Sequence, residues 1–222
     1  MDAIKINNCI VTIVSGHCKT TLTFSRYKIK LRDKIHNKIN NMRKLKVQMN
    51  FQGINWNDDM VTFCIDNLKN VDNILLGRIT AEAFIPYWKD VAENQDPNDI
   101  NSRVGKPIND IPKVIFSNNL KSNKWDNTTI IKGDFEEEIK NLKENNGKEI
   151  IFYGGISFVS SLVEHRLVDE YYLLVDPLAI SSNEPILKFI NRSLSLQLKE
   201  CKPFECGTMV LYYCVILDKN NV

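Results

Sequence analysis

The sequence predicts an α/β fold built on a largely parallel sheet with helices on both faces. Three observations support this prediction. Short apolar runs alternate along residues 43–175 with segments of helical spacing, and this alternation is typical of a parallel sheet. Two of these runs lead into glycine, at Gly77 and at Gly154-Gly155. The last two runs, 195–200 and 208–216, alternate apolar and polar residues as an antiparallel pair does.

The strands are predicted from short apolar runs bounded by turn residues. The first run directly follows Met42, so we expect the domain to span residues 42–222. The internal strands are predicted at 43–50, 73–78, 113–117, 128–131, 149–153 and 169–175.

Helices are predicted where apolar residues recur at helical spacing behind a capping residue. Asn57 or Asp58 can cap a helix over 57–70, and Asp134 can cap one over 135–144. A further helix is predicted over 158–164, behind the Gly154-Gly155 turn.

The segment around Pro86 is predicted to interrupt helical structure. A helix from Thr80 is expected to end at Tyr87 because proline removes a backbone donor. Residues 89–112 are polar and rich in Asn, Asp and Pro, which predicts a surface loop with a helical turn around 98–104.

The composition is that of a globular protein. The chain has 222 residues, 43% hydrophobic and 25% charged, and fits one domain or one domain with an appendage. No apolar run approaches the roughly 20 residues that cross a bilayer, so we expect a soluble, cytoplasmic protein without membrane contact. The six cysteines form no C-x-x-C pair, which favours reduced thiols and argues against a metal site.

The first 41 residues differ from the rest in charge. They carry eight basic and two acidic side chains, a net charge of +6, so the remaining chain carries −4. This acidic body argues against nucleic acid as the main partner. We favour a poorly ordered extension for residues 1–41. One alternative is an organellar targeting segment, and another is that these residues do not belong to the functional protein.

The run Gly154-Gly155-Ile156-Ser157 follows a predicted strand and opens a helix. Glycine lets the backbone approach a phosphate closely, while the N–H groups and the positive end of the helix attract it. These four residues are therefore candidates for holding a pyrophosphate. The alternative is a tight turn that uses glycine for steric reasons alone.

Two other strand ends carry polar groups. Gly77-Arg78-Ile79-Thr80 places a guanidinium and a hydroxyl at the mouth of a helix, and Ser117 ends the next strand. Ligands of open α/β sheets collect outside the carboxyl ends of the strands, so the three turns are expected to converge on an elongated anion. Taken singly, Arg78 also fits a solvated surface charge, and Ser117 a turn residue.

Five strings form an ordered set along the chain. They are Asn73-Ile74-Leu75-Leu76-Gly77-Arg78-Ile79-Thr80, Phe84-Ile85-Pro86-Tyr87-Trp88, Pro112-Lys113-Val114-Ile115-Phe116-Ser117, Ile151-Phe152-Tyr153-Gly154-Gly155 and Leu167-Val168-Asp169-Glu170-Tyr171. As a set, these strings resemble the dihydrofolate-reductase-like family that includes the RibD C-terminal reductase domain. The resemblance covers roughly Met42 to Ile216.

The resemblance implies a three-layer αβα fold, an NADPH site and often a homodimer. The implied activity is hydride transfer to a small heterocyclic or sugar-derived substrate, as in the RibD C-terminal 5-amino-6-(5-phosphoribosylamino)uracil reductase of riboflavin biosynthesis. By position, the resemblance implies three groups of cofactor contacts. Gly77, Arg78 and Thr80 would contact the adenosine-side phosphates, and Ser117 would lie near the adenine ribose. The pyrophosphate would be surrounded by Gly154, Gly155, Ile156 and Ser157.

The sequence departs from the family pattern at two places. Asn118 and Asn119 follow Ser117 where relatives commonly carry a base for the 2′-phosphate of NADPH, so NADH is not excluded, and Lys121 is a candidate substitute for that base. Relatives also have a motif like S-x-D-G-F and a covering loop after the first strand. Here residues 51–56 run directly into the helix, with Gln52 where an acid would stand.

The substrate side of the predicted site is therefore less defined than the cofactor side. We assign Gln52, Trp56, Tyr87 and Trp88 to the substrate cleft, with core or lid packing as the alternative for Tyr87 and Trp88. No catalytic residue is named, because paired acids such as Asp58 and Asp59 at a helix start are usually caps. The leading hypothesis is an NAD(P)H-dependent reductase. The alternative is a degenerate nucleotide-binding or dimerisation module without turnover.

Overall fold

The computed structural model describes residues 2–6, 9–13, 42–50, 57–177 and 194–216. The chain divides into two compact units, Met1–Met42 and Arg43–Val222. In the first unit, strands β1 (Asp2–Ile6) and β2 (Cys9–Ile13) pair antiparallel. The other described elements belong to the second unit. The predicted cleft residues Gln52 and Trp56 lie outside the described residues.

The second unit is built on an eight-stranded sheet. Its strands are β3 (Leu45–Asn50), β4 (Val71–Gly77), β5 (Lys113–Phe116), β6 (Thr128–Ile131), β7 (Glu149–Phe152), β8 (Glu170–Val175), β9 (Leu196–Pro203) and β10 (Met209–Val215). Their order is β6-β5-β4-β7-β3-β8-β10-β9. Strands β3 to β8 run parallel, and β10 pairs antiparallel with β8 and β9. The predicted mixed sheet with an antiparallel C-terminal pair is confirmed.

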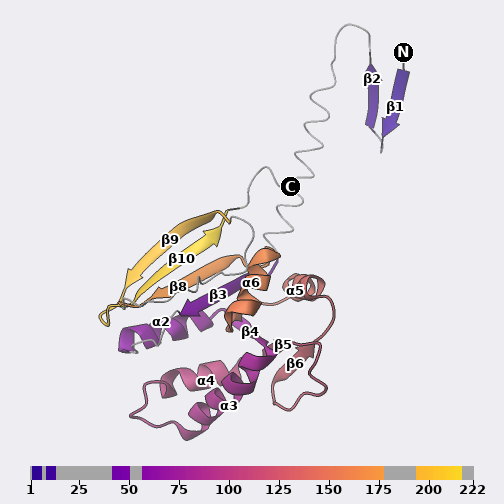
Figure 1. Ribbon diagram of the computed structural model, residues 1–222. Coiled ribbons are helices and arrows are strands. Elements are labelled where there is room, and N and C mark those ends of the chain that lie inside the picture. The colour runs from indigo at the N-terminus through magenta and orange to yellow at the C-terminus, as the bar shows by residue number, and fades with distance from the viewer. Residues whose placement is uncertain (1, 7–8, 14–41, 51–56, 178–193, 217–222) are drawn as a thin grey trace. The chain divides into compact units, whose positions relative to one another are not determined.

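Helices lie on both faces of the sheet, which gives the predicted three layers (Figure 1). They are α2 (Asp58–Leu68), α3 (Arg78–Asn94), α4 (Ser102–Asp110), α5 (Phe135–Glu144) and α6 (Ile156–Glu164). Successive side chains of a strand point to opposite faces, so each strand feeds two cores. Leu45 and Val47 of β3 pack with α5 and α6. Ile74 and Leu76 of β4 pack with α2, α3 and α4.

Two predicted helix caps are confirmed. The Asn57 side chain accepts a hydrogen bond from the Met60 N–H at the start of α2, and Asp134 accepts one from the Glu137 N–H at the start of α5. A capping side chain of this kind satisfies one of the backbone donors that the first turn of a helix leaves unpaired. Helices α2 and α5 therefore supply the partners for their own first turns.

The prediction that Pro86 ends a helix is wrong. Helix α3 runs through Pro86 to Asn94. Pro86 lies on the exposed side of the helix, where solvent can satisfy the carbonyl that loses its partner. The helix is held to the sheet by buried side chains on its other side, Ala81, Ile85 and Val91.

The predicted loop over 89–112 is also largely helical. Its first part completes α3, and its last part forms α4, where Val104 and Ile108 are buried one turn apart. Gly105 lets the two helices approach closely, because a Cβ there would lie 2.6 Å from a methyl group of Val91. Within the described residues, no helix is long and apolar enough to cross a membrane.

Ion pairs gather at the edge of the sheet where the parallel strands begin. Arg43 is 5% exposed at its side chain and pairs with Asp72, and its Nε donates to the Lys148 carbonyl at 2.7 Å. Lys46 is buried and contacts Glu149 at 2.9 Å. Two further pairs lie at the same edge, Lys44 with Glu170 and Lys143 with Asp169, both at 2.6 Å. At this amino edge, these four basic side chains are therefore paired with acidic side chains of the same protein.

Candidate functional site

The predicted turns leave the sheet at its opposite, carboxyl edge. Strands β4 and β7 are parallel neighbours, with Leu75 beside Phe152, and the Tyr153 N–H donates to the Leu75 carbonyl at 3.2 Å. Gly77 lies beside Phe116 in the parallel pair of β4 and β5. The turns that begin at Gly77, Ser117 and Gly154 therefore share one rim, as the sequence predicts.

The helices that follow β4 and β7 diverge. Helix α3 packs on the face that carries Ile74 and Leu76, whereas α6 packs on the face that carries Leu45 and Val47. Neighbouring parallel strands whose helices go to opposite faces form a topological switch point, and ligands of open α/β sheets bind outside the strand ends at such a point. The rim between β4 and β7 is this point in the present fold.

The two glycines after β7 have different reasons to be glycine. At Gly154 a Cβ would overlap the ring of Phe152, so the protein itself excludes a side chain there. At Gly155 a Cβ would have no atom within 4 Å, and the backbone (φ −77°, ψ 163°) suits any residue. Nothing in the described residues requires glycine at 155. The space above it is open, and residues 154–157 are exposed.

Helices α3 and α6 begin at this rim without side-chain caps. Their N-cap residues are Gly77 and Gly155, in contrast to the Asn57 and Asp134 that cap α2 and α5. Among the described residues, the starts of both helices thus direct N–H groups without side-chain caps, and partial positive charge, toward one rim, an arrangement that favours an anion. Helix α4 also lacks a side-chain cap, but Asp99 of the preceding turn accepts hydrogen bonds from the N–H groups of Asn101 and Ser102 at its start.

An aromatic cluster lies at the start of α6, close to the end of β4. Phe158 in the first turn of α6 stacks on Phe152 with centroids 4.9 Å apart and planes at 9°. It also meets Phe135 edge-on at 5.3 Å. A Cβ on Gly77 would lie 3.5 Å from the same Phe158 ring, in ordinary contact. One side chain thereby links the start of α6 to the end of β4.

Arg78 lies at the rim but is paired. Its guanidinium contacts Glu82 at 2.9 Å, one turn further along α3, and both side chains are about 40% exposed. Thr80 is half-buried in the same first turn. The predicted guanidinium and hydroxyl are thus both at the mouth of α3, with a carboxylate beside the guanidinium.

Ser117 is buried and already bonded. Its hydroxyl accepts hydrogen bonds from the N–H groups of Asn119 and Leu120 at 3.3 and 3.2 Å. Asn118 exchanges two hydrogen bonds with the backbone of Gly133, which ties the loop after β5 to the loop after β6. The structure therefore places Ser117 next to the rim and shows it holding a turn.

Tyr87 and Trp88 lie nine and ten residues into α3, about 15 Å along the helix from its start. They contact each other edge-on at 5.0 Å, and Trp88 also meets Phe84 at 6.0 Å. Trp88 packs against the α2–α4 core, while Tyr87 is 49% exposed. The contacts shown for these two residues are packing contacts, and a place in a substrate cleft remains a prediction.

The sequence reasoning passed over Tyr153, which directly precedes the two glycines. Its ring stacks on Phe84 of α3 at 5.5 Å. Burial, together with the nearby Cys64 of α2, raises the pKa of Tyr153 above its usual range. Burial also raises the pKa of Cys64 to about 11. Both groups therefore keep their protons at neutral pH. In the sequence, the position of Tyr153 directly before Gly154 and Gly155 is the feature that could have identified it.

Asp58 and Asp59 act as structural residues. Asp58 pairs with Arg103 of α4 at 2.6 Å, and Asp59 accepts hydrogen bonds from the N–H groups of Met60 and Glu205. A depression of about 300 Å³ lies between Asp58 and the loop before α4. These contacts agree with the interpretation of the two acids as residues of a helix start.

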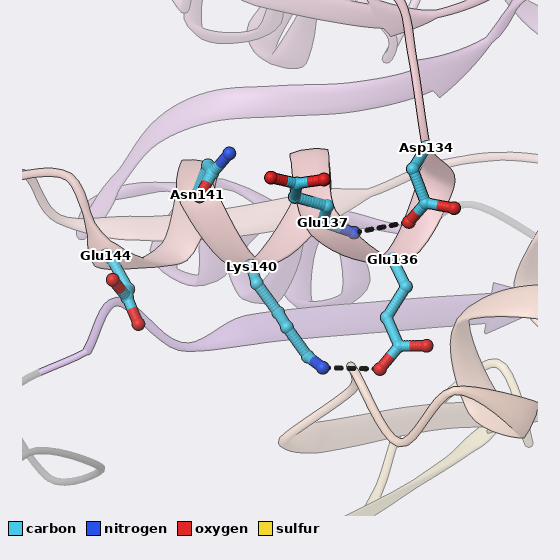
Figure 2. Close-up of a pocket in the computed structure, with 6 residues that line it drawn as sticks. All are labelled: Asp134, Glu136, Glu137, Lys140, Asn141 and Glu144. Carbon is cyan, nitrogen blue, oxygen red and sulfur yellow. Dashed lines mark hydrogen bonds and ion pairs between the residues drawn. The ribbon is translucent and has the colours of Figure 1, made fainter.

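A second depression, of about 330 Å³, lies on the outer side of α5 (Figure 2). Four of its six lining side chains are acids, and Lys140 is held by Glu136. The pKa of Glu136 is lowered by its hydrogen bonds to Lys140 and then His165, so the face stays anionic. Such a surface repels a diphosphate and contributes nothing to the rim of β4 and β7.

Comparison with known proteins identifies the family. The family model of the RibD C-terminal domain matches residues 56–210. The chain belongs to this family. The uncharacterised protein YyaP of Bacillus subtilis (strain 168) is 30% identical over 149 residues, which cover 67% of this chain and 76% of YyaP.

Solved structures show the same fold at low identity. The riboflavin biosynthesis reductase Rib7 of Saccharomyces cerevisiae has a TM-score of 0.51 and 12% identity, over 84% of this chain and 99% of Rib7. The dihydrofolate reductase of Enterococcus faecalis, complexed with NADP(H), has a TM-score of 0.50 and 13% identity, over 78% of this chain and 98% of that one. The predicted dihydrofolate-reductase-like fold is confirmed, and the chain is a member of a reductase family by domain and fold.

Proposed function

We propose that the protein is an NAD(P)H-dependent reductase that transfers a hydride to a small heterocyclic or sugar-derived substrate, as in the uracil-derivative reductase step of riboflavin biosynthesis. Family membership supports the reaction class. The E. faecalis neighbour, which holds NADP(H) on the same fold, supports the cofactor class.

The observation that carries the proposal is the open space at Gly155. This glycine has no steric reason within the described chain, and it starts a helix whose first donors have no side-chain cap. A diphosphate would fill that space and accept those hydrogen bonds. The residues present therefore fit the phosphate portion of a nicotinamide dinucleotide.

The protein's part in this reaction is to bind and orient. Gly155, Ile156 and Ser157 would hold the diphosphate from the α6 side, and Gly77, Arg78 and Thr80 from the α3 side. When bound, the nicotinamide would supply the hydride, which is the chemically demanding part of the reaction. Phe158 packs at the start of α6 and close to Gly77, and it would help to hold the two turns in position around the bound cofactor.

Nicotinamide fluorescence on titration with NADPH and NADH tests the proposal. Wild type is expected to bind, and Gly155→Asp to bind at least ~10-fold more weakly, a loss of about 1.4 kcal/mol. The new carboxylate would occupy the α6 donors and repel the phosphates. Gly155→Asn, of nearly equal size and without charge, separates repulsion from bulk. Arg78→Ala is expected to weaken binding less than Gly155→Asp, because Glu82 already occupies the guanidinium.

Equal affinity in wild type and Gly155→Asp would remove the basis for this site. NADPH that binds normally but is never oxidised with any pyrimidine or pteridine acceptor would favour a nucleotide-binding module without turnover. The binding titration and the turnover assay therefore decide different parts of the proposal.

A further inference from the structure

The three strands at the antiparallel end of the sheet carry their charges on one face. These strands are β8, β10 and β9, with β9 at the edge of the sheet. Directly paired residues of neighbouring strands lie on the same face, so the registers assign each side chain to a face. One face packs in part against α2. Its charged and amide side chains are Glu170, Gln197, Lys199, Glu200 and Lys202.

The opposite face of the same strands, all of which the structure describes, has no charged side chain. We call it the apolar face. It consists of Leu173, Val175, Leu196, Leu198, Cys201, Pro203, Met209, Leu211, Tyr213 and Val215. The register of β10 and β9 shifts near Tyr212, and the apolar side chains of β9 stay on one face across this shift.

The outer part of the apolar face is exposed. Leu196, Tyr213 and Val215 still pack against the core that α5 and α6 cover. Further out, Val175 and Leu198 are 40% and 49% exposed. Figure 1 shows β9 and β10 on the far side of the sheet from α5. An exposed apolar surface without charges is typical of an interaction site.

We propose that the apolar face is the interface through which two copies of this chain form a dimer. A twofold axis brings the same patch of both copies together. Two identical charged patches meet with like charges unless these are displaced from the axis, whereas a patch without charges meets its copy without repulsion. The depletion of charge on this face therefore favours a second copy over a charged partner. The inference does not depend on the proposed function.

The area of the apolar face is sufficient for such a dimer. Since a large apolar side chain has an area on the order of 150 Å², its exposed and half-buried members together offer roughly 500 Å². One partner of a standard-size interface contributes about 800 Å², of which about 65% is apolar in homodimers. The two values agree.

The features of β9 favour packing by the face over pairing by the edge. An exposed edge strand can add a strand from another chain, and proteins prevent this with register shifts, lysines and prolines. Strand β9 has all three, at the shift opposite Tyr212, at Lys199 and Lys202, and at Pro203. The proposed dimer therefore stacks two sheets face to face.

The matched variants are Leu198→Glu and Gln197→Glu. The two residues are neighbours in β9, both are exposed, and they lie on opposite faces. Each substitution adds one negative charge to the same strand. Sedimentation equilibrium over about 1–100 µM protein measures the dimer dissociation constant, and circular dichroism checks that both variants fold.

Wild type is expected to sediment at twice the mass of the chain at the upper concentrations. Leu198→Glu should weaken the dimer at least ~10-fold, because the interface contains the new charge twice. Gln197→Glu should stay within about twofold of wild type, because its charge points away from the interface. Wild type that stays monomeric up to about 100 µM would overturn the proposal. Equal effects of the two variants would also overturn it, because the interface would then lie elsewhere.

Cys201 gives a second readout that needs no substitution. Its thiol is free and exposed in the single chain. Alkylation followed by peptide mass spectrometry should be fast in dilute protein and about fivefold slower or more at concentrations where the dimer forms. Equally fast alkylation in the dimer would contradict the proposal. Slow alkylation at every concentration would show that the apolar face is covered within one copy, which would overturn it as well.

Discussion

The two edges of the parallel sheet differ in how their polar groups are paired. At the amino edge, Arg43 and Lys46 are buried and paired with Asp72 and Glu149. At the carboxyl edge, α3 and α6 start at glycines, without side-chain caps, below open space at Gly155. Charged side chains of the first edge are paired with one another, whereas the helix starts of the second edge have no side-chain caps among the described residues. Substitutions should therefore affect stability at the first edge and binding at the second.

The largest effect is expected from Asp72→Asn at the amino edge. The pKa of Asp72 lies below its usual range: burial opposes ionisation, but hydrogen bonds from Asn73, the Lys148 N–H and Arg43 outweigh it. Removing the charge leaves Arg43 buried without its anion. We expect a loss of about 2–3 kcal/mol in the free energy of unfolding at pH 7, because Asp72 is itself one-third exposed. Cofactor affinity should not change.

The pH dependence gives the sign of this interaction. A carboxyl with a lowered pKa in the folded state stabilises above its unfolded pKa, near 4, and the stabilisation is lost as the pH falls through the folded value. Urea unfolding of wild type and Asp72→Asn should therefore differ most above pH 5 and converge toward pH 2. A difference that stays constant with pH would show that Asp72 acts through packing alone.

The next largest effect separates the two glycines of the rim. Gly154→Ala drives a methyl group into the Phe152 ring and is expected to cost about 2 kcal/mol of stability. Gly155→Ala meets open space and should change stability by less than about 0.5 kcal/mol. Thermal unfolding of the pair measures this. Equal destabilisation would mean that the space at 155 is filled.

The smallest effect compares a capped helix with an uncapped one. Asp134→Ala removes the cap of α5 and should cost about 1 kcal/mol, whereas Gly155→Asp adds a capping carboxylate to α6 and should keep or slightly raise stability. Chemical denaturation of both variants checks the contrast. Destabilisation by Gly155→Asp would show that the start of α6 is already satisfied.

The sequence predicted the rim but not the reasons for its parts. Glycines behind apolar strands located the turns at Gly77 and Gly154 correctly, because backbone geometry there depends on local residues. The different roles of Gly154 and Gly155 depend on the Phe152 ring, whose position is a tertiary fact. Tyr153 was missed because its contacts come from α2 and α3.

The predicted helix boundaries were wrong where tertiary packing outweighs local helix propensity. Pro86 breaks an isolated helix, yet α3 continues because Ala81, Ile85 and Val91 are buried and Pro86 is exposed. The role of Gly105 could not be predicted from the sequence, because it depends on how closely α3 and α4 approach each other. The Arg78–Glu82 pair was not predicted, although its i,i+4 spacing is typical of ion pairs on a helix.

The most direct test of the open carboxyl edge is amide hydrogen exchange with and without saturating NADPH. The account predicts fast exchange without ligand at Arg78–Thr80 and Gly155–Ser157, and at least ~10-fold slower exchange with it. The acidic outer face of α5, residues 134–144, should be unchanged. The account would be contradicted by exchange rates at the two glycine turns that are the same with and without NADPH, or by protection confined to the face of α5.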